Sequence, residues 1–415
     1  MSTLRHRLRL THATGFWVVA AAFVAVMAIA ALPTPLYVLY ERRDHFSGLV
    51  VTVIFAVYAV GVIASLFLAG HVSDWLGRRP VLVPAVLLSA LSAGIFIVWP
   101  TLAGLLLARI VSGLSVGAMT ATATAYLADL HAARGSNTSG RRAELVATAA
   151  NLGGIGFGPL CAGALAQFLP DPLVLPYAVF GVLALVLATA AVLAPETAGV
   201  EDRPAYRMRR ISVPAAGRRR FLAAAVGGMI AFALFGLFTS LAPSFLAVTL
   251  DRPSHALAGL AAFLVFASGA LAQSLLSRLD ARRLSAVGLA LLPIGLVIVT
   301  AATWVPSLAA FLAGGALAGA GAGLLIKGGI DTVLDIAPPE LRAEVLAAFF
   351  LASYLGISAP IVGLGLATQY VSARVSLIGF AAVLVLALAA AAPALLGGVR
   401  RRLNTTDIHY QGASS

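Results

Sequence analysis

The chain has 415 residues, of which 60% are hydrophobic and 11% are charged, and its mean hydropathy is +0.98. Soluble domains contain roughly 45 to 50% apolar and about 25% charged residues, so a water-soluble globular protein is excluded. The net charge of +12 is typical of basic cytoplasmic anchors in a membrane protein, so no nucleic-acid partner is expected. The single cysteine, Cys161, excludes an intrachain disulfide and a cysteine-based metal cluster.

Apolar runs recur along the whole chain and predict an all-α polytopic membrane protein. About 20 apolar residues in a helix cross a hydrocarbon core of about 30 Å, and the chain contains twelve runs of this kind. The predicted spans are residues 15–40, 47–70, 80–99, 101–130, 143–169, 173–194, 221–247, 254–277, 284–304, 306–335, 342–369 and 374–397. Tight turns such as Trp99-Pro100 and Trp304-Val305-Pro306 separate them. The first run is too long for a cleaved signal peptide and lacks a small-residue cleavage site.

Basic residues are distributed unevenly between alternate loops. With the amino terminus placed inside, the inner segments hold 22 Lys and Arg residues and the outer segments hold 4. Arg109 and Lys327 lie within spans and complete the 28. Because positively charged loops stay in the cytoplasm, both termini are predicted to be cytoplasmic. The strong use of Arg, Ala and Gly indicates a bacterial protein, so the bacterial inner membrane is the expected location.

The chain repeats one plan twice. A long polar segment, residues 196–220, divides the spans into an amino-terminal six-helix bundle, residues 1–195, and a carboxy-terminal six-helix bundle, residues 221–400, which precedes a tail, residues 401–415. Equivalent residues recur at separations of 200, 206 and 208 residues: Arg142-Ala143-Glu144 with Arg342-Ala343-Glu344, Gly113 and Gly117 with Gly319 and Gly323, and Gly61 with Gly269. Many secondary transporters consist of such repeated halves, with the substrate site near the midplane between them.

The loop between the second and third spans carries a glycine-rich, charged sequence that runs from Gly70 to Arg79. It resembles the signature loop of the major facilitator superfamily, Gly-x-Leu-x-Asp-Arg-x-Gly-Arg-Arg/Lys, with Val72 and Trp75 in place of the Leu and the first Arg. The resemblance implies a charged lock that favours one conformer of the transporter. The residues of this predicted conformational gate are Gly70, Asp74, Gly77, Arg78 and Arg79.

The fourth span places Arg109 four and eight residues before Gly113 and Gly117. This spacing is similar to the Arg-x-x-x-Gly-x-x-x-Gly element of the superfamily, which implies a role of Arg109 in proton transfer or substrate binding. An arginine that faces lipid at the centre of the bilayer costs roughly 2.5 to 3.5 kcal/mol, so we expect the side chain to point into the protein. A structural arginine held by hydrogen bonds is the alternative.

The fifth span contains Gly154, Gly158, Pro159 and Gly163. Their spacing resembles Gly-x-x-x-Gly-Pro-x-x-Gly-Gly, the element that marks drug:proton antiporters within the superfamily, with Ala162 in place of one glycine. The proline and the small residues make a helix that bends and packs closely. Ordinary packing of small residues is the alternative.

Few charged side chains lie within the spans, and these are the candidates for proton coupling: Arg109, Asp331, Lys327 and Asp129. Lys327, the only lysine, and Asp331 are four residues apart, so they can pair on one helix face. An ionisable group inside a membrane indicates a functional site, but a self-neutralised pair near the helix end is an equal alternative. Asp129 and Glu144, at inner helix ends, can instead serve as gating salt bridges with neighbouring arginines.

The substrate cavity is predicted from aromatic and amide residues on the spans that line it in the superfamily. The candidates are Tyr37, Tyr58, Asn151, Phe235, Phe238, Gln273, Phe350 and Tyr354. Each can equally serve helix packing. An aromatic cavity with few fixed charges would suit lipophilic or weakly basic compounds.

The chain is thus identified as a member of the major facilitator superfamily, of the drug:proton antiporter type. This implies proton-coupled efflux of a small-molecule substrate, as in multidrug resistance, by a monomer in the lipid bilayer, with no cofactor and no metal. A symporter or facilitator for a small metabolite on the same fold is the first alternative, and a membrane receptor is the second. An enzyme or an ATP-driven pump is not expected, because the sequence has no Gly-x-Ser-x-Gly elbow and no phosphate-binding Gly-x-x-x-x-Gly-Lys-Ser/Thr loop.

Overall fold

The computed structural model describes residues 10–69, 73, 76–133, 140–197, 217–338 and 341–397. In these residues all regular structure is helical, and no strand is present. They contain 12 helices or runs of consecutive helices that are long and apolar enough to cross a membrane. The predicted fold class is therefore confirmed: the chain is an all-α, multi-pass membrane protein.

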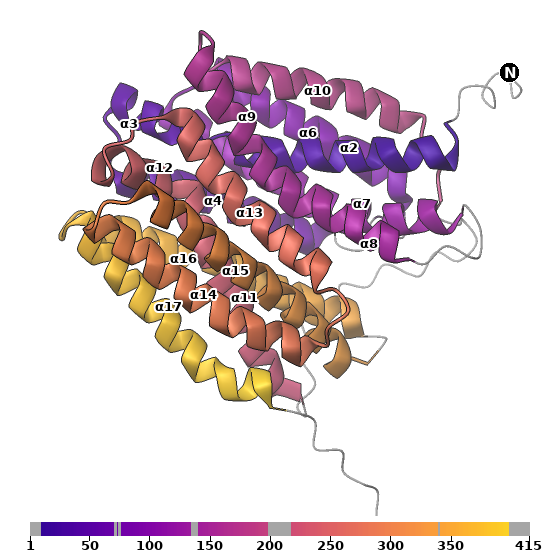
Figure 1. Ribbon diagram of the computed structural model, residues 1–415. Coiled ribbons are helices and arrows are strands. Elements are labelled where there is room, and N and C mark those ends of the chain that lie inside the picture. Colours follow the sequence, from indigo (N-terminus) through magenta and orange to yellow (C-terminus); the bar gives the residue numbers. More distant parts are fainter. Residues whose placement is uncertain are drawn as a thin grey trace, which may run out of the picture.

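The first six spans form one group of helices, coloured indigo to magenta in Figure 1. Two spans are interrupted: the first by the 3-10 turn η1 and the fifth by the π-helical segment η2. The elements are α2 (His12–Ala31), η1 (Thr34–Leu36), α3 (Tyr37–Asp44), α4 (Gly48–Ala69), α6 (Arg78–Val98), α7 (Leu102–Ala132), α8 (Arg141–Thr148), η2 (Ala149–Gly153), α9 (Gly154–Phe168) and α10 (Leu175–Val192). The first interruption follows from Pro33 and Pro35, which lack the backbone N–H that a continuous helix needs.

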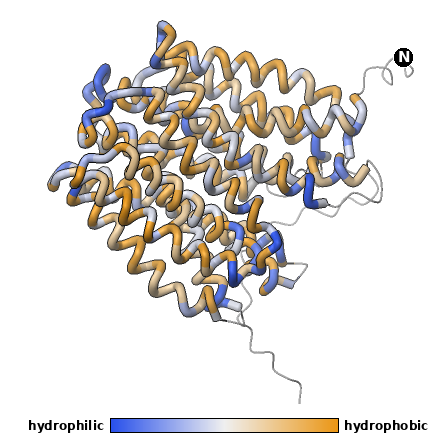
Figure 2. Tube along the Cα trace, in the orientation of Figure 1, coloured by the Kyte–Doolittle hydropathy of each residue, from blue (hydrophilic) through white to orange (hydrophobic). Residues whose placement is uncertain are grey.

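The last six spans form a second group, coloured rose to yellow in Figure 1. Here the first span is the interrupted one, with the π-helical segment η4 after Pro243. The elements are α11 (Arg218–Ser240), α12 (Ala242–Ser244), η4 (Phe245–Thr249), α13 (His255–Leu275), α14 (Ala281–Trp304), α15 (Leu308–Ile336), α16 (Arg342–Ala367) and α17 (Ala373–Leu396). Hydrophobic residues cover the length of the helices, and hydrophilic ones gather at their ends (Figure 2).

The repeated glycines make equivalent helix contacts in the two groups. In the first group Gly61 of α4 packs on Gly113 of α7, and a Cβ on either would lie 3.0 Å from the other's Cα. In the second group Gly269 of α13 packs on Gly319 and Gly323 of α15. Small residues let two backbones approach closely in a membrane. The internal repeat read from the sequence therefore corresponds to one helix contact used twice.

The two bundles meet along two pairs of helices, α9 with α13 and α4 with α16. We call the end at which α2 begins and α17 finishes the terminal end, and the opposite end the distal end. At the distal end Ser244 donates a hydrogen bond to Glu41 (3.0 Å), and the backbone N–H of His255 donates to the Gln167 side chain (3.0 Å). Both bonds join residues of different bundles, so the distal end of the interface is held together by polar contacts.

Candidate functional site

A network of charged groups at the terminal end fixes the start of α6. Gly77, with φ of +105°, makes a turn that an L side chain rarely tolerates, and α6 begins at the next residue. The backbone N–H groups of Arg78 and Arg79 donate to the two carboxylate oxygens of Glu196, at 2.8 and 3.0 Å. The Arg78 guanidinium donates to Asp129 at 3.0 Å. A carboxylate at a helix N-terminus is stabilised by the helix dipole, so Glu196 ties α6 to the end of α10.

Arg109 lies about two turns inside α7, with only 2% of its surface exposed. Its Nη1 donates to the carbonyl oxygen of Ala30 at 2.6 Å, and its Nη2 to that of Phe55 at 3.4 Å. The guanidinium carbon lies 4.5 Å from the ring centre of Tyr58 and 5.5 Å from that of Phe55. The side chain faces the protein interior, as the sequence predicted. Among the described residues no carboxylate forms a salt bridge with it, so carbonyl dipoles and aromatic faces stabilise its charge.

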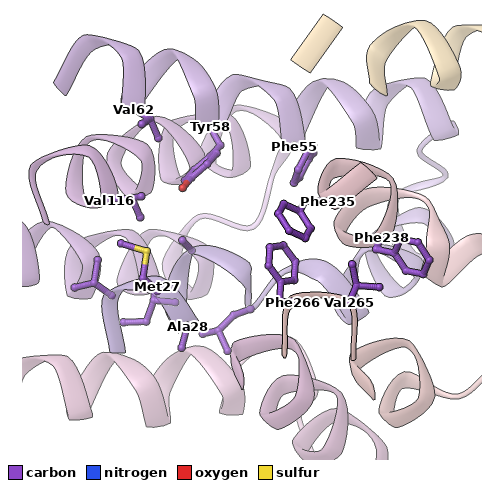
Figure 3. Close-up of a cluster of buried hydrophobic side chains, with 14 of the residues drawn as sticks. Met27, Ala28, Phe55, Tyr58, Val62, Val116, Phe235, Phe238, Val265 and Phe266 are labelled. Carbon is purple, nitrogen blue, oxygen red and sulfur yellow. The ribbon is translucent and has the colours of Figure 1, made fainter. Parts of the chain in front are cut away.

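An aromatic seam crosses the interface between the bundles beside Arg109. The ring centres of Tyr58 on α4 and Tyr354 on α16 are 6.5 Å apart, and Tyr354 also meets Phe232 on α11 at 5.1 Å. The rings of Phe235 and Phe266 stack at 4.4 Å. Figure 3 shows these two rings from the second bundle next to the side of the first bundle that carries Tyr58 and Phe55. We define the aromatic seam as Phe55, Tyr58, Phe232, Phe235, Phe266 and Tyr354.

The glycines of α9 lie where this helix touches both α2 of its own bundle and α13 of the other. A Cβ on Gly158 would overlap the backbone of Ala28, and one on Gly163 would overlap the backbone of His255. Pro159 lies inside the helix, and the π-helical segment η2 precedes it. Both features loosen the hydrogen-bond ladder of a helix. The fifth span is therefore an interrupted helix in backbone contact with both bundles.

An ion pair joins the bundles on the terminal side of the interface. Lys327 Nζ on α15 lies 2.7 Å from Glu144 Oε1 on α8. The exposed fraction of the side chain is 15% for Lys327 and 57% for Glu144. Among the ion pairs of the described residues, the expected pair of Lys327 with Asp331 is not formed. The intrahelical pairing was wrong because a carboxylate of the opposite bundle reaches the same ammonium group.

The sequence of residues 16–282, well over half of the chain, matches the family model of the Major Facilitator Superfamily. The chain belongs to this superfamily. No curated protein is similar enough in sequence to match.

Two solved structures show the same superfamily fold. The chain is similar to the human organic anion transporter MFSD10 (TETRAN), with 17% sequence identity and a TM-score of 0.64 over 94% of this chain and 100% of that one. It is also similar to a mutant of the nucleoside transporter NupG, with 12% identity and a TM-score of 0.72 over 91% of this chain and 99% of that one. Identities this low show the shared fold alone. As a member of the major facilitator superfamily the chain is a membrane transporter and not an enzyme.

The superfamily fold brings some of the predicted cavity residues together and keeps others apart. Tyr58, Phe235 and Tyr354 belong to the aromatic seam, and Tyr37 is buried in the span whose Ala30 carbonyl accepts a hydrogen bond from Arg109. The remaining candidates lie elsewhere. Phe238 packs on Phe311, Gln273 donates to Gly323 O within the second bundle, Phe350 packs on Phe349, and Asn151 lies in η2.

Three of the five predicted gate residues lie together in one network. Gly77, Arg78 and Arg79 meet in the network around Glu196, whereas Gly70 and Asp74 lie outside the described residues. Asp129, a coupling candidate, is the partner of Arg78 at the end of α7. Sequence reasoning missed Glu196 as a member of this network. The signal that could have found it is a lone carboxylate directly after the sixth span, in Pro195-Glu196-Thr197.

Proposed function

We propose that this superfamily member is a proton-coupled antiporter that exports small organic compounds by alternating access. The observation that carries this proposal is the place of the α9 glycines and Pro159. They lie in α9, which has backbone contact with α13 of the second bundle. An interrupted helix that contacts helices of both bundles can bend when one bundle rocks against the other. This supports the interpretation that Gly154, Gly158, Pro159 and Gly163 form the helix element of an antiporter.

The moving units in this proposal are residues 1–195 and 221–400, connected by residues 196–220 and followed by the tail 401–415. The hydrogen bonds at the distal end hold one side of the interface closed. The ion pair of Lys327 with Glu144 spans the other side. Rocking requires that the two sets of contacts break in turn. The network of Arg78, Asp129 and Glu196 acts as the gate that favours one conformer.

We assign the coupling proton to Asp331, with Lys327 as the group that responds to the movement. Asp331 lies one helical turn from Lys327 on α15 and is half-buried. When the bundles separate at the terminal end, Lys327 loses Glu144, and Asp331 is the next carboxylate within its reach. A nearby ammonium group favours the ionised form of a carboxylate. Opening of the terminal end therefore favours proton release there.

The positive-inside rule supports a terminal end in the cytoplasm. We propose that the protein acts as a monomer in a bacterial inner membrane. Opening of the terminal end then exposes the substrate site to the cytoplasm, and opening of the distal end exposes it to the outside. Entry of a proton from outside and its release at Asp331 gives the direction required for efflux.

A symporter or facilitator for a small metabolite is the alternative on the same fold. The two structural relatives carry the names of an organic anion transporter and a nucleoside transporter, and neither name specifies drug efflux. Proteoliposomes with an imposed pH gradient and a panel of anionic, neutral and cationic compounds separate the possibilities. Antiport predicts substrate movement driven by the gradient and opposite to proton flow. Flux that is independent of the gradient would replace the antiporter with a facilitator.

A further inference from the structure

We propose that Arg109 and Tyr37 form a binding site for the acid group of an amphipathic organic anion, whose apolar body lies against the aromatic seam. This inference rests on the proposed transport function, for which it names the substrate class. It also replaces the expectation of weakly basic compounds drawn from composition.

The charge at the centre of the bundles is positive. The carboxylates of the described residues lie in loops or within about one and a half turns of a helix end: Glu41, Asp44, Asp129, Glu144, Asp171, Glu196, Asp251, Asp280, Asp331, Asp335 and Glu344. Arg109 lies deeper, about two turns inside α7, and is 2% exposed. A desolvated guanidinium stabilises a bound anion electrostatically and repels a cation. The centre of the interface therefore selects against positively charged compounds.

Two hydrogen-bonding groups near this charge are unused. The Nε of Arg109 and the hydroxyl of Tyr37 are buried, and neither has a hydrogen-bond partner among the described residues. Tyr37 is 2% exposed and lies seven residues, about two helical turns, after Ala30, whose carbonyl oxygen accepts a hydrogen bond from Arg109. Buried polar groups normally have partners, because an unpaired one keeps its full desolvation cost. A carboxylate, sulfonate or phosphate ester supplies acceptor oxygens that satisfy both groups.

Tyr58 separates Arg109 from the opposite bundle. Its ring centre lies 4.5 Å from Cζ of Arg109 and 6.5 Å from the ring centre of Tyr354 of the opposite bundle. Since Tyr354 belongs to α16, movement of one bundle against the other removes the support of Tyr58. The covering ring is thus released by the same motion that opens the transporter. In the closed arrangement Arg109 is shielded, and in the open one it faces the interface.

The aromatic seam determines the rest of the ligand. Phe235 and Phe266 stack at 4.4 Å with an interplanar angle of 19°, and Phe55 lies on the first bundle next to them (Figure 3). Aromatic rings make their most favourable stacking contacts with other planar apolar groups. A ligand that combines one acid group with a planar apolar body therefore fits both parts of the interface.

The test is direct binding to the full-length protein in lipid nanodiscs at neutral pH, without a pH gradient. Three probes share one ring system: naphthoate, naphthamide and naphthylmethylamine. Naphthoate is expected to bind at least about tenfold more tightly than the other two, which is the effect of one charge-assisted hydrogen-bonded pair. Equal binding of naphthoate and naphthamide, or tighter binding of the amine, would overturn the proposal.

Substitutions at Tyr37 and Arg109 distinguish loss of ligand binding from loss of folding. Tyr37→Phe removes a hydroxyl that has no partner, so the folded protein is expected to keep its thermal stability while naphthoate binds about threefold to tenfold more weakly. Tyr370→Phe, on an exposed turn, is the matched control and leaves binding unchanged. Arg109→Lys keeps part of the affinity, and Arg109→Gln abolishes the preference for naphthoate over naphthamide. Unchanged affinity in Tyr37→Phe would contradict the assignment even if Arg109→Gln does not fold.

Transport measurements distinguish failure of this site from failure of the antiporter proposal. Flux of naphthoate that needs Arg109 but ignores the pH gradient would leave the site intact and remove proton coupling. Gradient-driven flux of naphthamide or naphthylmethylamine that is unaffected in Tyr37→Phe and Arg109→Lys would retain the antiporter and remove the site.

Discussion

Lys327 and Glu144 are 183 residues apart in sequence, yet Lys327 Nζ donates to Glu144 Oε1 at 2.7 Å across the interface of the two bundles. It is the one inter-bundle salt bridge among the described residues. At the distal end, the equivalent cross-bundle contact is a hydrogen bond from Ser244 to Glu41. The two contacts lie on opposite sides of the aromatic seam, so their strengths set the balance between opening at one end and opening at the other.

Glu144→Gln is expected to shift this balance toward opening at the terminal end. Glu144 is more than half exposed, so the pair contributes only about 0.2 to 1 kcal/mol, and the population of the open form rises by about fivefold at most. Reaction of cysteines introduced at the terminal end with a polar maleimide measures this shift. Asp280→Asn is the matched control, because its pair with Arg283 lies within one bundle. The reversed pair Glu144→Lys with Lys327→Glu should restore the original balance. Unchanged labelling in Glu144→Gln would contradict the role of the pair.

Ser244→Ala is expected to have the opposite effect. The substitution removes the hydroxyl that donates to the half-buried Glu41 carboxylate. Loss of this hydrogen bond destabilises the closed state of the distal end by about 0.5 to 1.5 kcal/mol. Labelling of cysteines at the distal end should rise, and labelling at the terminal end should fall. Ser372→Ala, which loses only a helix cap in the second bundle, provides the control. Increased labelling at both ends would indicate a loosened fold rather than a shifted equilibrium.

The sequence predicted features that depend on local composition. The number of spans, the interior direction of Arg109 and the repeated glycine contacts of α4 with α7 and α13 with α15 all follow from hydropathy, insertion cost and small residues. Each of these is decided by residues a few positions apart or by the lipid environment. Such features can therefore be predicted from the sequence even when the arrangement of the two bundles is unknown.

The partners of polar groups on other helices could not be predicted from local spacing rules. The spacing of Lys327 and Asp331 satisfies the helical pairing rule, but packing of α8 against the second bundle brings Glu144 to Lys327 instead. Gln273 was expected in the cavity, and it bonds to the Gly323 carbonyl because α13 and α15 touch there. The partners of these polar groups depend on how helices far apart in sequence face one another.

Gly158→Ala is expected to damage both stability and transport. An added Cβ would overlap the backbone of Ala28, so α9 must move away from α2, at a cost of typically 1 to 3 kcal/mol. Gly153→Ala, five residues earlier in η2, is the matched control, because its added Cβ meets nothing within 4 Å. Thermal unfolding in detergent should show a lower midpoint for the first variant and an unchanged or higher one for the second. Equal midpoints would mean that close packing of α9 is not required.

Asp331→Asn is expected to uncouple substrate exchange from proton movement. The variant cannot lose a proton when Lys327 leaves Glu144, so substrate-dependent proton release should disappear while exchange of labelled substrate across proteoliposomes continues. Asp335→Asn, one turn further along α15 and exposed, is the control and should release protons as the unmodified protein does. Release is read from a pH-sensitive dye on addition of substrate to purified protein. If Asp331→Asn still releases protons on substrate addition, the coupling carboxylate must be sought among the other half-buried acids of the described residues: Glu41, Asp44, Asp129, Glu196 and Glu344.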